Sequence, residues 1–172
     1  FDDYLHFSVL QSNIHEIWLR RQASTLESRN CYTTTDCFDT FPFPRNLSDT
    51  KIDTATKAGK EFYDYRGNVL SDRSLGLTNI YNLLNNPKCQ DVDIYNLRQL
   101  QINMDLSVME CYGWIDIELQ HDFYPDDRKK IRFTPSPAAQ REIFTRLVAL
   151  NQEIAAQEAT QGLVVEAGED DE

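Results

Sequence analysis

The sequence predicts a mainly α fold: a helical bundle-like domain of about five helices, with a short strand and an extended Phe-Pro-Phe-Pro corner. Apolar residues recur at intervals of three and four over long segments, which is the period of an amphipathic helix. Strand-like composition is confined to a short run near residue 31, and prolines follow it. With 172 residues, 41% of them hydrophobic, the chain is long enough to bury one core.

The first helix is predicted over residues 3–22. Asp2 or Asp3 can cap its start, and two arginines in its last turn complement the negative end of the helix dipole. One broad apolar stripe runs along it, made by Phe7, Leu10, Ile14, Ile17 and Trp18.

Residues 31–44 read CYTTTDCFDTFPFP, and a metal site and a structural corner are the two interpretations. The threonine- and aromatic-rich start favours a short strand, which Pro42 and Pro44 end because proline cannot donate to a ladder. Cys31 and Cys37 have no second ligand pair at metal-binding spacing. We therefore interpret this stretch as a corner with phenylalanines packed beneath it.

Four more helices are predicted downstream from caps, stops and apolar spacing. Residues 119–133, which include a local basic run, predict a loop or short hairpin between the last two helices. The predicted helix starts are Ser48 or Asp49, Thr78, Asp91 or Asp93, and Pro137; the predicted ends are Gly67, Asn85-Asn86-Pro87, Gly113 and Gly162.

The net charge of −11 is unevenly distributed. Glu166–Glu172 holds five of the 28 acidic residues and no base, so we expect a solvated tail; the rest has 23 acids against 17 bases, a net charge of −6. Bulk charge therefore does not favour nucleic acid, and a DNA role must rest on a local basic patch. The chain shows no initiator methionine, signal peptide or long apolar run, and we expect a soluble piece of a cytoplasmic protein with no membrane partner.

No catalytic motif is present in the sequence. The six glycines occur singly, with no Gly-x-Gly, no Gly-x-Ser-x-Gly elbow and no His-Glu-x-x-His helix. We therefore expect no catalytic, cofactor-binding or metal-binding residue in this segment.

Two groups of residues are candidates for DNA contact. Arginines followed by a hydroxyl-rich stretch suit phosphate and base edges, although an exposed loop before an edge strand has the same composition. The second group is a basic run that Asp126 and Asp127 partly cancel. The candidates are Arg20, Arg21, Arg29, Asn30, Tyr32, Thr33, Thr34 and Thr35 in the first group, and Arg128, Lys129, Lys130 and Arg132 in the second.

Five motifs, in order, cover residues 3–163 and resemble a known family. They are FSVLQSNIHEIW, YTTTDCFDTFPFP, LTNIYNLLNNP, MDLSVMECYGW and RFTPSPAAQREIFTRLVALN. Together they are similar to the C-terminal part of large adenine-N6 DNA methyltransferases, which include single-chain Type IIL/IIG restriction-modification enzymes and methylases of phage-defence systems.

The resemblance implies a domain organisation and a function. Residues 1–47 would end a target recognition domain, residues 48–163 would form the C-terminal helical region, and residues 164–172 would be an acidic disordered tail. The segment would hold double-stranded DNA for its own methyltransferase domain, which binds S-adenosylmethionine and lies upstream, with or without a fused nuclease. The alternative is a helical module that docks a partner protein of a defence complex without touching DNA.

Overall fold

The computed structural model describes residues 3–25 and 40–169, and the side chains of residues 3–21 and 40–160. It confirms the mainly α fold class, with six helices and one two-stranded antiparallel sheet in these residues. The elements are α1 (Tyr4–Gln11), α2 (Asn13–Thr25), α4 (Asp49–Arg73), α5 (Leu77–Leu84), α6 (Val92–Tyr112), β1 (Asp122–Pro125), β2 (Ile131–Thr134) and α7 (Pro137–Glu169).

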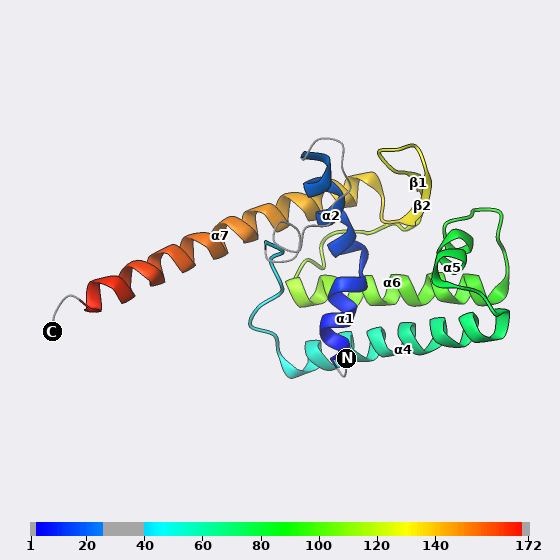
Figure 1. Ribbon diagram of the computed structural model, residues 1–172, viewed down its shortest axis with the longest axis horizontal. Coiled ribbons are helices and arrows are strands. Elements are labelled where there is room, and N and C mark those ends of the chain that lie inside the picture. Colours follow the sequence, from blue (N-terminus) through cyan, green and yellow to red (C-terminus); the bar gives the residue numbers. More distant parts are fainter. Residues whose placement is uncertain (1–2, 26–39, 170–172) are drawn as a thin grey trace.

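Helices α4 and α6 run side by side in opposite directions and form the base of the fold (Figure 1). Helix α5 covers one end of this pair, and α7 projects away from the body at the other end (Figure 1). Helices α1 and α2, assigned from the sequence to the end of a recognition domain, pack directly on this base; the Ser8 hydroxyl, for example, donates to the Ala55 carbonyl at 2.6 Å. None of the helices in the described residues is both long and apolar enough to cross a lipid bilayer.

The single helix predicted over residues 3–22 is two helices in the structure. Asp3 caps the first of them, accepting from the backbone N–H groups of Leu5 and His6 at 3.1 and 3.2 Å. The chain is extended at Ser12, whose hydroxyl donates to the Val9 carbonyl at 2.7 Å and so competes with regular helical bonding. The apolar stripe survives the break because Ile14, Ile17 and Trp18 are all buried.

Two predicted helix ends are wrong, and both were placed at glycines. Helix α4 continues through Gly67 to Arg73, and α7 continues through Gly162 to Glu169, which takes in part of the expected tail. A glycine costs a helix only about 1 kcal/mol relative to alanine. In α4 the burial of Val69 beyond the glycine outweighs this cost, and the helix ends where Ser74 adopts a left-handed conformation.

The other predicted boundaries agree more closely with the structure. Helix α6 lies between Asp91 and Gly113, whose φ of +74° is the left-handed conformation that glycine favours. Helix α5 ends before Asn85 as predicted, but Gly76, and not Thr78, is its N-cap residue. Pro137 occupies the first turn of α7, where the Ser136 hydroxyl accepts from the Ala139 N–H at 3.2 Å.

The Phe-Pro-Phe-Pro stretch is a packed, extended corner, as predicted. Phe41 is buried and meets Phe43 edge to face at 5.0 Å between ring centroids, with His15 at 4.7 Å on another side. The Tyr112 hydroxyl donates to the Pro42 carbonyl at 2.9 Å and ties the corner to α6. The predicted strand before it, with Cys31 and Cys37, lies outside the described residues.

Two clusters of buried side chains form the core. One joins the corner, α2, the end of α6 and the start of α7, and the other joins α4, α5, most of α6 and the hairpin. Their largest fully buried members are Trp18, Ile14, Ile143 and Leu147 in the first cluster, and Phe62, Ile80, Ile94, Leu97 and Met104 in the second.

The crossing of α1 over α4 gives a stability prediction with a control on the same helix. A Cβ added at Gly59 would overlap Ser8 Oγ and lie 2.8 Å from the Tyr4 carbonyl oxygen, whereas one added at Gly67 meets nothing within 4 Å. We expect Gly59→Ala to lower the free energy of unfolding by about 1–3 kcal/mol through overpacking. Gly67→Ala should raise it by up to about 1 kcal/mol through helix propensity. Urea denaturation measures both, and changes of the same sign would contradict this packing.

Candidate nucleic-acid interface

The second basic run forms the tip of a β-hairpin. Strands β1 and β2 pair with Phe123 opposite Phe133, and residues 126–130 connect them. The backbone of Asp126 exchanges hydrogen bonds with the tip, donating to the Lys130 carbonyl and accepting from the Lys129 N–H, both at 2.8 Å. Its side chain also accepts from the N–H groups of Arg128 and Lys130, at 2.9 and 2.8 Å. One residue thus fixes a turn that carries three exposed cations.

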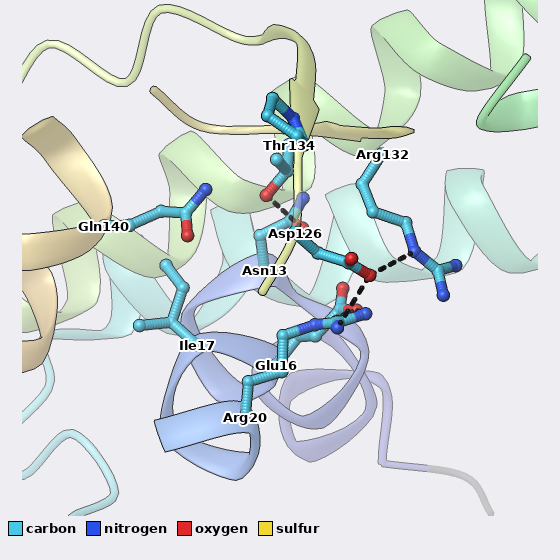
Figure 2. Close-up of a pocket in the computed structure, with 9 residues that line it drawn as sticks. Asn13, Glu16, Ile17, Arg20, Asp126, Arg132, Thr134 and Gln140 are labelled. Carbon is cyan, nitrogen blue, oxygen red and sulfur yellow. Dashed lines mark hydrogen bonds and ion pairs between the residues drawn. The ribbon is translucent and has the colours of Figure 1, made fainter. Parts of the chain in front are cut away.

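The structure joins the two predicted groups at the same carboxylate. Arg20, from α2, and Arg132, from β2, each approach Asp126 Oδ2 at 3.4 Å (Figure 2). Arg20 also contacts Glu16 Oε1 through two nitrogens, at 2.9 and 2.6 Å. The cavity between these side chains has a volume of about 30 Å³, enough for a water molecule and too small for a substrate.

Burial and hydrogen bonding shift the pKa of the Asp126 carboxyl in opposite directions. Burial acts to raise the pKa of its carboxyl, but the N–H groups of Lys130 and Arg128 and the two arginines outweigh burial and hold the pKa below its ordinary value. The carboxylate is therefore a stable acceptor at the centre of the basic cluster.

The twelve residues predicted to contact DNA fall into three sets in the structure. Arg128, Lys129 and Lys130 are exposed at the tip, and Arg21 lies on α2 with a partly exposed side chain. Arg20 and Arg132 are drawn together as described. The other candidates lie outside the described residues, and their DNA contacts stay a prediction; they are Arg29, Asn30, Tyr32, Thr33, Thr34 and Thr35.

A buried arginine supports the hairpin from below. Arg98 of α6 is only 6% exposed, and the pKa of its guanidinium is lowered by this burial. It donates to the carbonyls of four residues at 2.9–3.0 Å, and its guanidinium carbon lies 4.9 Å from the ring centroid of Phe123 and 5.8 Å from that of Phe133. The four carbonyls, all at the end of α5 or in the loop after it, belong to Leu83, Leu84, Asn86 and Cys89.

A buried carboxylate sets the hairpin against α2. Asp105 accepts from the backbone N–H and the side-chain amide of Asn13 at 2.8 and 2.7 Å, and from Gln101 at 3.2 Å. His121 Nε2, just before β1, lies 2.8 Å from the same carboxylate. The side-chain oxygen of Asn13 in turn accepts from the hydroxyl of Thr134 in β2 at 3.3 Å.

Beside the hairpin, a more open cleft of about 350 Å³ lies between α2, α5, α6 and β2. Arg132 borders both this cleft and the small cavity at Asp126. In the described part of the chain, no three His, Cys, Asp or Glu side chains gather in a way that could hold a metal ion. The features of this face are thus fixed cations beside an open cleft, an arrangement suited to binding an anion.

Sequence reasoning missed the two residues beneath the site, Asp105 and Arg98. Their spacing carries a signal, because Arg98 follows Ile94 by four positions and Asp105 follows Leu97 by eight, which places both on the apolar side of α6. A charged residue at a core position of a helix requires internal partners. The sequence predicts that Asp126 lies at a turn and partly cancels the basic run, and the structure shows that its side chain builds the turn at the tip.

Comparisons with known proteins identify a solved structure with a similar fold. No protein-family model matches the sequence, and a search of curated proteins gives no match. Among solved structures, the chain is similar to the Type IIL restriction-modification enzyme MmeI, whose structure was determined in complex with DNA. The TM-score is 0.61 at 19% identity, over 89% of this chain and 16% of the other. The chain therefore shares its fold with a part of that enzyme and spans about 16% of its length.

The role of Arg98 can be tested by a charge-conserving substitution. A lysine ammonium cannot reach four carbonyls and stack on two rings, so Arg98→Lys leaves buried carbonyls unpaired. We expect the free energy of unfolding to fall by about 3 kcal/mol, measured by urea denaturation. Arg146→Lys is the control, since Arg146 pairs with the exposed carboxylate of Asp116 and should lose less than about 1 kcal/mol. Equal losses for the two variants would contradict the supporting role.

Proposed function

We propose that this chain is the non-catalytic, DNA-orienting C-terminal segment of an adenine-specific DNA methyltransferase of the restriction-modification or phage-defence kind. Methyl transfer from S-adenosylmethionine would take place on the enzyme's own methyltransferase domain, outside this segment. The fold shared with part of a restriction-modification enzyme supports the proposal, as does the order of the five sequence motifs. The segment would hold the duplex and orient the recognition domain.

The hairpin tip carries the proposal. Three adjacent cations are exposed on a turn that four hydrogen bonds of Asp126 hold in place. The Asp126 side chain is only 8% exposed, and its carboxylate lies between Arg20 and Arg132 (Figure 2). Asp127 is the other acidic residue in the tip. Long cationic side chains on an exposed turn suit phosphate oxygens, which position DNA without reading its sequence.

A second candidate function is docking of a partner protein without DNA contact. The net charge of −6 outside the acidic end favours it. So does the open face of α6, where three apolar side chains are exposed: Val92 by 74%, Tyr95 by 55% and Leu106 by 45%. The two functions can be distinguished experimentally, because only the DNA function predicts that the chain binds a duplex with an affinity that falls as salt concentration rises.

Removing one cation from the tip should weaken DNA binding and reduce its dependence on salt concentration. We expect Lys130→Gln to weaken binding to all duplex sequences alike and to lower the slope of log affinity against log salt by about one unit, because one phosphate contact is lost. Lys57→Gln is the matched control, since Lys57 is an exposed lysine on α4, and α4 lies on the other side of α6 from the hairpin (Figure 1). Fluorescence anisotropy with a labelled duplex at several salt concentrations gives both slopes.

Two results would contradict this account. If the wild-type chain shows no salt-dependent binding to the duplex, the DNA function is rejected and protein docking through α6 is the better account. If Lys57→Gln and Lys130→Gln lower the slope equally, the tip is not the DNA contact.

A further inference from the structure

The two arginines at Asp126 differ in the donors they leave available. Arg20 is held by Glu16 through two nitrogens and by Asp126 through a third contact. Arg132 meets Asp126 only through Nε, and its two terminal nitrogens make no hydrogen bond within the described residues. Figure 2 shows the outer end of the Arg132 guanidinium turned away from Asp126 and the small cavity.

Arg132 is carried by a fixed strand. The next residue, Phe133, is buried, and its backbone N–H donates to the Asn85 side chain at 2.9 Å. Thr134 is tied to Asn13 in α2, and Arg132 itself pairs with Tyr124 across the hairpin. The guanidinium is thus positioned before any ligand arrives, which lowers the ordering cost of binding.

We propose that Arg132 is a bidentate contact for one backbone phosphate of DNA at the edge of the cleft, and that Asp126 is its positioning residue. This inference rests on the DNA-binding function proposed above. A guanidinium held at Nε can still present two parallel N–H groups to two phosphate oxygens, whereas an ammonium acts as a point charge. Arg20, with its nitrogens engaged by two carboxylates, holds α2 against the hairpin and does not contact DNA.

Two substitutions separate the contribution of the guanidinium's shape to DNA binding from the contribution of its charge. We expect Arg132→Lys to weaken binding to a mixed-sequence DNA duplex about tenfold, the effect of one charge-assisted hydrogen bond, with an unchanged salt slope because the charge is kept. Arg132→Gln should weaken binding at least as much and also lower the slope by about 0.9. Lys57→Arg is the control for exchange of one cation for the other outside the hairpin and should bind like the wild type.

The positioning role of Asp126 has a matched control in Asp127. In Asp126→Asn the amide oxygen can still accept from the tip N–H groups, but the carboxylate that holds Arg132 is lost. Charge alone predicts stronger DNA binding for either aspartate-to-asparagine change. We expect Asp127→Asn to strengthen binding and Asp126→Asn to weaken it. In an Arg132→Gln background Asp126→Asn should weaken binding no further, a coupling that general destabilisation of the tip would not produce.

The outcomes distinguish this inference from the function on which it rests. If Arg132→Lys binds like the wild type while Lys130→Gln lowers the salt slope, DNA binding stands and the bidentate contact is overturned. If Asp126→Asn strengthens binding as Asp127→Asn does, the positioning role is overturned. If the wild-type chain does not bind the duplex, both the function and the inference fail.

Discussion

The buried carboxylate of Asp105 is the interaction on which the rest of the fold depends. It is completely inaccessible to solvent, and an unpaired carboxylate in such a place would be prohibitively unstable. Four contacts offset this cost: two from Asn13, one from Gln101 and one from His121. Asn13 begins α2, so the carboxylate also lies at the positive end of that helix. Helices α2 and α6 and the start of the hairpin are therefore tied to one group.

The candidate interface follows from this arrangement. Asn13 fixes the start of α2, and Arg20, two turns further along, comes within 3.4 Å of Asp126 on the hairpin. Arg98 supports the same hairpin from α6 through its contacts with Phe123 and Phe133. An acidic protein can thus present a small basic surface at a defined place. This surface is the one that we propose contacts DNA.

Much of the fold could be predicted from the sequence because helix period, caps and proline chemistry act locally. The limits of α6 and the corner at Phe41 follow from such signals. The break at Ser12 could not be predicted, since the acceptor that caps α2 comes from residue 105. The helix ends placed at Gly67 and Gly162 failed because one glycine costs a helix only about 1 kcal/mol, which the burial of Val69 outweighs in α4. The two basic groups were identified separately, and only tertiary structure shows that Arg20 and Arg132 share a carboxylate.

Native-state hydrogen exchange at the backbone amide of Asn13 tests the central role of Asp105 most directly. An amide in the first turn of a helix has no acceptor within that helix, and at Asn13 the acceptor is the Asp105 carboxylate, at 2.8 Å. Our account predicts that this amide exchanges only through global unfolding, with the same protection as amides in the middle of α6. Exchange through a low-energy local opening, as at a fraying helix end, would contradict it.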